Sequence, residues 1–237
     1  MKKLLILILL VFLVFIIYKS NEDHLIDYMV IGDSMALGMN SYGNKTFGYN
    51  DYLKNYLENN NLIHKYNDYF VKSNYKINEL NNDIINNKNI LYNDKNYSIK
   101  KELREADLVT ISIGMDEIVD LINNDNLKEF NKIKKKLDGI SYDMDNLIKN
   151  ITSLSKSKII LIGYYNPYKN YNIDVEKIFS YLSDKYSTIA KKYSINYVDI
   201  YKIIKKDKTF LPNKLDYHLT SRGYLEIAKE IINKNNL

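Results

Sequence analysis

Three apolar runs that end in glycine constrain the fold of this chain more than any other feature. They are IDYMVIG at 26–32, DLVTISIG at 107–114 and SKIILIG at 157–163. Each run is short, rich in β-branched residues and almost continuously apolar, which predicts a strand buried on both faces. Such strands belong to parallel sheets whose two faces are covered by helices. We therefore expect an α/β protein.

Segments with helical periodicity lie between these runs. The longest, 115–155, is expected to be interrupted near Gly139, and 88–97 is expected to be a polar, asparagine-rich loop. The remaining expected elements are helices at 47–59, 76–87, 99–106, 174–192 and 221–234, and weaker strands at 62–71 and 195–200. This alternation predicts a three-layer α/β/α sandwich with a mostly parallel sheet. A chain of 237 residues without repeats or an internal linker holds one such domain, which we place at 26–237.

The N-terminus carries a separate signal. Residues 4–18 are continuously apolar and follow Met-Lys-Lys. As a helix this run would be roughly 22 Å long, short of the ~30 Å hydrocarbon core, but lysines at both ends can snorkel. Small residues suited to a cleavage site do not follow it, so an uncleaved signal anchor at 1–20 is favoured over a cleaved signal peptide. We expect a single-pass membrane protein with a short stalk at 21–25 and its domain outside the cytoplasm; secretion is the alternative.

Composition excludes several classes of protein. The chain has no cysteine, which excludes disulfide scaffolds, thiol nucleophiles and cysteine-ligated zinc. Its formal charge is +5, but Lys2, Lys3 and Lys19 flank the apolar run, and the lysines elsewhere are interleaved with acids. No basic stripe or recognised module remains, so we expect no nucleic-acid partner.

Polar residues follow each of the three clear strands. Gly32-Asp33-Ser34 ends the first, Gly114-Met115-Asp116-Glu117 the second, and Asn166-Pro167 comes shortly after the third. Asp216 and His218 precede the last helix. The carboxyl ends of parallel strands meet at one edge of the sheet, where α/β proteins place their sites. A serine there, with a histidine as base and a carboxylate to orient it, predicts nucleophilic catalysis.

Each of these residues also has an ordinary structural interpretation. Ser34 and Asp216 are good helix-capping residues, and Asn-Pro is a normal turn signal. Among the three histidines, His24 lies in the stalk and His64 in a weak strand, which leaves His218 as the one candidate base. The pattern gains weight because its elements occur together and in order.

With these residues in place, the sequence resembles the SGNH (GDSL-like) esterases and acylhydrolases from about Tyr28 to its C-terminus. Gly32-Asp33-Ser34 resembles the first block of that family, ADLVTISIGMDE the third and DYHLTSRGY the last. The segments GYNDYL and GYYNPY are similar to a branch of the family found in Bacillota. The resemblance implies a flavodoxin-like sheet of about five strands.

The resemblance also implies roles for individual residues. Ser34 would be the nucleophile, His218 the base and Asp216 its orienting partner. The backbone N–H groups of Ser34 and Asn74 would form the oxyanion hole, together with Asp116 at the third-block position. Substrate binding is assigned to Asp33, Gly114 and Asn166. Neither a metal nor an organic cofactor is implied.

Three positions depart from the family pattern. Asp216 stands two residues before the histidine, where three is commonest. Asn74 replaces a glycine, although asparagine tolerates left-handed backbone better than most residues. Asp116 replaces an asparagine that donates a hydrogen bond, and an ionised carboxylate only accepts them.

These observations predict a membrane-anchored, extracytoplasmic serine esterase acting on small-molecule or envelope-glycan esters, or on lipids. An O-acyltransferase using the same site and a catalytically impaired envelope-binding module are the alternatives. Asp33, Asp116 and Glu117 offer oxygen ligands of the kind a divalent cation prefers, but three acids at strand ends are insufficient for a metal site.

Overall fold

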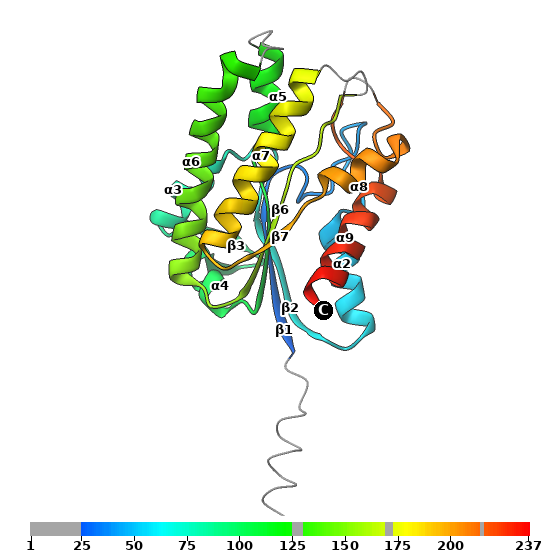
Figure 1. Ribbon diagram of the computed structural model, residues 1–237. Coiled ribbons are helices and arrows are strands. Elements are labelled where there is room, and N and C mark those ends of the chain that lie inside the picture. Colours follow the sequence, from blue (N-terminus) through cyan, green and yellow to red (C-terminus); the bar gives the residue numbers. More distant parts are fainter. Residues whose placement is uncertain (1–24, 125–129, 169–172, 214–215) are drawn as a thin grey trace, which may run out of the picture.

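The computed structural model describes residues 25–124, 130–168, 173–213 and 216–237. Within these ranges, five parallel strands form one sheet in the order β2-β1-β5-β6-β7 (Figure 1). The strands are β1 Ile26–Gly32, β2 Ile63–Val71, β5 Leu108–Ser112, β6 Lys158–Ile162 and β7 Asn196–Val198. This is the doubly wound order of flavodoxin-like folds, so the predicted fold class is confirmed.

Helices cover both faces of the sheet, as the alternating pattern predicted (Figure 1). One layer contains α3 (Ile77–Ile85), α4 (Ile99–Glu105), α6 (Phe130–Leu154) and α7 (Ile173–Lys192). The opposite layer contains α2 (Tyr49–Asn59), α8 (Tyr201–Lys206) and α9 (Ser221–Asn235). In a doubly wound sheet this arrangement leaves the carboxyl ends of the strands open between the layers, which is where the candidate residues were placed.

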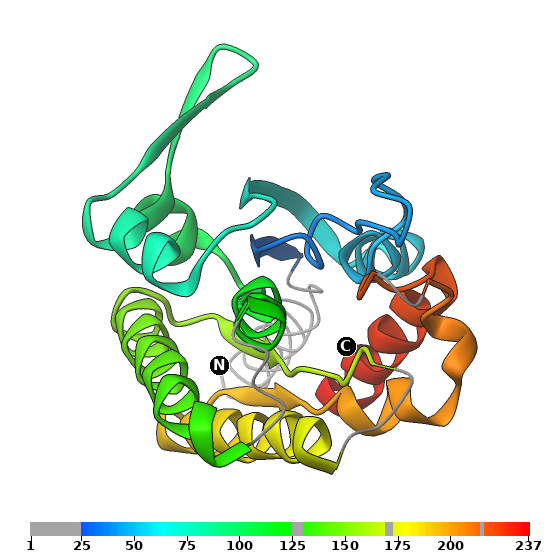
Figure 2. The same cartoon turned by 90° about the horizontal axis from the view of Figure 1, so that it is seen from above.

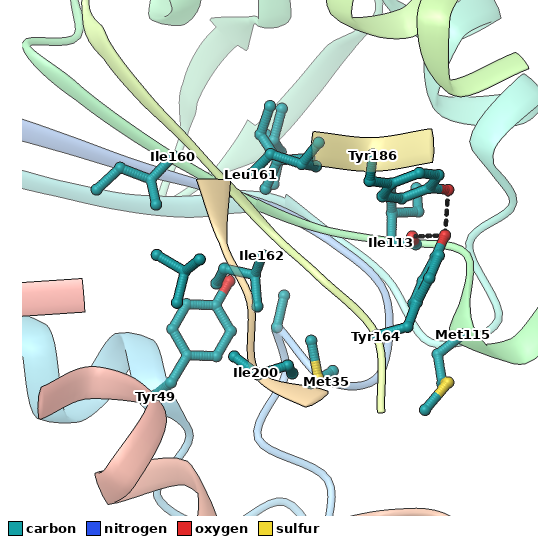
Figure 3. Packing of buried hydrophobic residues seen from close by; sticks show 14 of the residues in the cluster. Met35, Tyr49, Ile113, Met115, Ile160, Leu161, Ile162, Tyr164, Tyr186 and Ile200 are labelled. Carbon is teal, nitrogen blue, oxygen red and sulfur yellow. Dashed lines mark hydrogen bonds between the residues drawn. The ribbon is translucent and has the colours of Figure 1, made fainter. Parts of the chain in front are cut away.

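The core between the layers is held by apolar side chains and by tyrosines whose hydroxyls are satisfied. Ile160, Leu161 and Ile162 of β6 are buried on both sides of the sheet (Figure 3). The Tyr164 hydroxyl donates to the carbonyl of Ile113 at 2.9 Å and also bonds to the Tyr186 hydroxyl. Because a buried hydroxyl without a partner is costly, these bonds fix the chain at the end of β5.

Two expected elements differ from the structure. Residues 89–98, expected as a loop, form an antiparallel hairpin of β3 (Asn89–Tyr92) and β4 (Lys95–Ser98) that projects from the domain (Figure 2). Asn93 and Asp94 both have positive φ, 47° and 59°, which is the backbone of a tight hairpin turn. The polar composition concealed the hairpin, because a projecting hairpin buries little and needs few apolar residues.

The expected interruption near Gly139 is also wrong. Helix α6 runs through Gly139, and a side chain there would meet nothing within 4 Å. A glycine in an exposed helix costs only about 1 kcal/mol relative to alanine, which the packing of a long helix offsets. Helix α5 (Met115–Asn124) ends well before this point. Helix α8 and a short 3₁₀ turn at Lys208–Phe210 were not expected.

The predicted anchor and stalk lie outside the described residues, except for Leu25. Among the helices that the structure describes, none combines the length and the hydrophobicity needed to cross a bilayer.

Candidate active site

The turn after β1 brings Ser34 to the carboxyl edge of the sheet. Gly32 has φ 151°, and a Cβ atom there would lie 1.9 Å from the carbonyl oxygen of Ser112 on the neighbouring strand. Only glycine allows this close approach. The N–H of Asp33 donates to the same Ser112 oxygen at 3.0 Å. The turn after β1 is therefore held against the end of β5, and Ser34 is the next residue in the chain after Asp33.

Asp33 stabilises this turn through hydrogen bonds made in the protein interior. Its side chain is fully buried, and its two carboxyl oxygens accept the N–H groups of Met35 at 3.1 Å and Gly114 at 2.8 Å. Gly114 has φ 98°, and a Cβ atom there would meet the Tyr164 hydroxyl and Ile77. These contacts join β1 to β5 at the edge that carries the site.

His218 is oriented by Asp216. Its Nδ1 lies 2.8 Å from Asp216 Oδ1, and its backbone N–H donates to the same oxygen at 2.7 Å. The Tyr217 ring stacks on the imidazole at 4.3 Å between centroids, and the Tyr165 hydroxyl donates to the Tyr217 carbonyl. A proton on Nδ1 leaves Nε2 as the acceptor. This Nε2 is buried and has no hydrogen-bond partner among the described residues, as a base awaiting a proton requires.

Ser34 is buried, and its hydroxyl donates to Asp116 Oδ1 at 3.4 Å. Asp116 lies in the first turn of α5 and is buried as well. His218 lies close enough to Asp116 to influence its ionisation. The nucleophile, the base and the third-block acid therefore meet, although they lie 82 and 102 positions apart in the sequence. The Ser34 hydroxyl is thus bonded to Asp116 and not to His218; catalytic hydrogen bonds are often long or poorly aligned before substrate binds.

The backbone N–H of Asn74, the expected oxyanion donor, lies beside Asp116. Asn74 has φ 55°, the left-handed conformation anticipated for asparagine at this position, and its N–H is directed at the Asp116 carboxyl. Glu117 holds the same segment, because its Oε2 accepts the N–H of Ile77 at 3.2 Å. Two consecutive acids of α5 thus face the N–H of Asn74, which lies between β2 and α3, and the N–H of Ile77, which begins α3.

The electrostatics of the site centre on two buried carboxyls. Burial and the nearby Asp116 raise the pKa of Asp33 to about 8, against the lowering effect of its N–H bonds. Burial likewise raises the pKa of Asp116, and His218, Ser34 and the Asn74 amide oppose that rise. Because the two acids interact, their titration belongs to the pair, which retains a proton near neutral pH.

The three residues assigned to substrate binding do other work. Asp33 and Gly114 are buried and bonded to each other. Asn166 is buried too: its side-chain amide donates to Glu176, and its oxygen accepts the N–H of Tyr168. All three residues hold loops in the structure, and their assignment to substrate binding stays a prediction. Strand position placed them at the carboxyl edge but did not show that the side chains of Asp33 and Asn166 are buried.

Sequence reasoning gave no positioning role to Tyr165, Glu117 and Glu176. Tyr165 supports the histidine loop, Glu117 the Asn74 segment and Glu176 the Asn166 turn. Only Glu117 had a sequence signal, as the acid next to Asp116. No cluster of three or more metal-type ligands occurs within the described part of the chain.

A comparison with protein families agrees with this geometry. The model for GDSL-like lipases and acylhydrolases matches residues 28–231, nearly the whole domain. The chain belongs to the GDSL-like lipase/acylhydrolase family. The resemblance to SGNH esterases is therefore confirmed, and this family member is a serine hydrolase that acts on ester bonds. Its placement in the Bacillota branch stays a prediction.

Solved structures show the same fold. The lipase Lip_vut3 from a goat rumen metagenome aligns with 88% of this chain and 96% of its own, at 17% identity and a TM-score of 0.69. Axe2, an acetylxylan esterase from Geobacillus stearothermophilus, aligns with 91% of this chain and 97% of its own, at 17% identity and a TM-score of 0.68. Catalytic mutants of Axe2 with a replaced serine, aspartate or histidine also match. No curated protein sequence matches the chain.

Proposed function

We propose that Ser34, His218 and Asp216 form the catalytic triad of this esterase. The observation that carries the proposal is the buried, partnerless Nε2 of His218, whose Nδ1 is bonded to Asp216 at the edge where Ser34 lies. That arrangement is the one a general base needs: one ring nitrogen oriented by a carboxylate and the other free to take a proton.

The triad performs hydrolysis in two stages. Ser34 Oγ attacks the ester carbonyl carbon while its proton passes to His218 Nε2. The tetrahedral intermediate then breaks its bond to the alcohol, which leaves with the proton from Nε2, and an acyl group stays on Ser34. Water attacks this acyl-enzyme and gives a proton to Nε2. Release of the carboxylic acid returns the proton to Ser34. The N–H groups of Ser34 and Asn74 donate hydrogen bonds to both tetrahedral oxyanions.

The proposed substrate is an acyl ester, foremost an acetyl ester, on a glycan of the cell envelope. The named activity of the structural neighbour Axe2 on acetylated xylan supports the acyl group. The apolar run at 4–18 supports the location, because it would anchor the domain at the outer surface of the membrane, beside envelope glycans.

Labelling with a serine-directed fluorophosphonate tests the triad. The parent protein should become labelled and should hydrolyse p-nitrophenyl acetate, and Ser34→Ala should lose both. Ser41→Ala, a buried serine on the loop after the site, is the matched control and should keep both. A folded parent protein that is neither labelled nor active would instead support the catalytically impaired binding module.

Cell fractionation tests the location. The full chain should partition with membranes, whereas a chain that begins at Asn21 should be soluble and active. A mature protein whose N-terminus lies near Asn21 would show cleavage and make the enzyme a secreted one.

A further inference from the structure

Asp116 is a buried acid whose neighbours act on its charge in both directions: burial and Asp120 disfavour the ionised form, whereas His218, Ser34 and the Asn74 amide favour it. Asp33 and Ser34 face it from the β1 turn, Asn74 from the segment before α3, His218 from the loop before α9, and Tyr165 from the segment after β6. Asp120 and Glu117 face it from α5 itself. No ion pair joins Asp116 to a lysine or arginine among the residues that the structure describes. An ionised Asp116 would therefore be a buried charge without a counter-ion.

The two oxygens of Asp116 differ in a way that points to a proton. Oδ1 accepts the hydroxyl of Ser34, whereas Oδ2 is buried and has no partner among the described residues. An unpartnered carboxylate oxygen is costly to bury, but a protonated one is a donor that an oxyanion can satisfy. In Asp33, by contrast, both oxygens already accept backbone N–H groups and have no free position for a new hydrogen bond to substrate.

We propose that Asp116 works as a neutral carboxylic acid whose Oδ2–H donates a hydrogen bond to the tetrahedral oxyanion. The inference rests on the proposed triad and extends it to the third-block position. Asp116 transfers no proton in this role: the hydrogen bond strengthens as charge develops on the oxyanion and weakens when the intermediate collapses. The burial of both carboxyls and their mutual repulsion maintain the neutral form.

The proposed neutral form of Asp116 predicts how activity changes with pH. Activity requires a protonated Asp116, so it falls as pH rises through the raised pKa of Asp116. An ionised Asp116 would repel the oxyanion. The alkaline fall should therefore be steep.

The experiment compares kcat/KM against pH, with p-nitrophenyl acetate, for the parent protein, Asp116→Asn and Asp116→Ala. The amide donates at every pH, so Asp116→Asn should lack the alkaline fall and exceed the parent protein above it. Asp116→Ala has no donor and should lose about 10²- to 10³-fold at the parent optimum. Asp120→Asn removes an exposed acid whose charge raises the pKa of Asp116, so it should move the alkaline fall to lower pH. Glu79→Ala, an exposed acid in the first turn of α3, is the control and should keep the parent profile.

A second measurement does not depend on activity. The infrared C=O band of a protonated carboxyl should be present in the parent protein at neutral pH and absent from Asp116→Asn, with both folds checked by circular dichroism. The inference is overturned if this band persists in Asp116→Asn, if Asp116→Ala matches the parent protein, or if Asp116→Asn is inactive while the parent turns over. Turnover that survives in Ser34→Ala would instead overturn the proposed triad, so the two failures are distinguishable.

Discussion

Two histidine–aspartate pairs lie at opposite edges of the sheet. At the carboxyl edge His218 Nδ1 is 2.8 Å from Asp216, and at the amino edge His64 Nδ1 is 2.6 Å from Asp27. The contacting atoms are the same. The His218 side chain is 13% exposed and the His64 side chain 67% exposed, and His218 lies at the same edge as Ser34 and the backbone N–H of Asn74. A histidine–aspartate pair is therefore not a site by itself; its surroundings decide what it can do.

Buried acids show the same contrast between the two edges. Glu102, buried at the amino edge, is bonded to Lys65 Nζ and Asn67 Nδ2, each at 2.6 Å. Asp116, buried at the carboxyl edge, has no lysine or arginine paired with it among the described residues. An acid whose charge is satisfied stabilises a fold, whereas one whose charge is not satisfied is held ready for chemistry.

The largest expected effect is a difference in kcat between substitutions of the two histidines. We expect His218→Ala to lower kcat by about 10⁴- to 10⁶-fold, because it removes the base, and His64→Ala to leave kcat unchanged. The double variant Ser34→Ala, His218→Ala should be no worse than either single variant, since the two residues act as one unit. Steady-state hydrolysis of p-nitrophenyl acetate measures all of them. Substantial turnover in His218→Ala would remove this histidine from the mechanism.

A smaller effect is expected at the aspartates of the two pairs. Asp216→Asn should lower kcat by up to about 10⁴-fold, because an amide does not hold the imidazole in the tautomer that leaves Nε2 free. The stacked Tyr217 ring still restrains the histidine, so the loss should not exceed that of His218→Ala. Asp27→Asn is the matched control and should change kcat little. Equal effects from the two substitutions would contradict the distinction between the pairs.

Glu117 tests how the site is supported. Glu117→Ala removes the acceptor for the Ile77 N–H and should loosen the Asn74 segment, lowering kcat by about 10- to 100-fold with little change in KM. Glu117→Gln keeps an acceptor oxygen and should recover most of that loss. Glu79→Ala, an exposed acid in the first turn of α3, serves as the control. A parallel rise in KM would point to substrate contact instead of positioning.

The smallest effects concern stability and have opposite signs at the two edges. Glu102→Gln should lower the free energy of unfolding by about 1–3 kcal/mol, since it weakens the bonds to Lys65 and Asn67, and should leave activity unchanged. Asp116→Asn should instead become relatively more stable as pH rises. The raised pKa means that the unfolded chain ionises first, from about pH 3.8, so the parent protein loses stability until pH passes the folded pKa.

Urea titrations at several pH values measure both substitutions. The gain in Asp116→Asn should approach about 1.4 kcal/mol for each unit by which folding raises the pKa. A stability difference between Asp116→Asn and the parent protein that does not vary with pH would contradict the raised pKa.

The sequence by itself determined the elements whose signals are local. Buried parallel strands are apolar along their whole length, so β1, β5 and β6 could be predicted from the sequence. The family blocks pointed to Ser34, Asn74, Asp116, Asp216 and His218 as candidate site residues. Ser34 directly follows β1, and Asp216 and His218 precede α9, so all three can be recognised without knowledge of any distant contact. Local signals failed at 89–98, where a polar hairpin looks like a loop, and at Gly139, where packing overrides a weak helix preference.

Only the tertiary structure decided what the polar residues at the strand ends do. Asp33 and Asn166 stand at the correct edge, but the direction of a side chain depends on which neighbours surround it, and both are turned inward. The coupling of Asp33 with Asp116 arises because β1 and β5 are adjacent in the sheet, although 83 positions separate the two acids. Pairing of strands far apart in the chain sets the burial and repulsion that raise a pKa, and no local pattern carries that information.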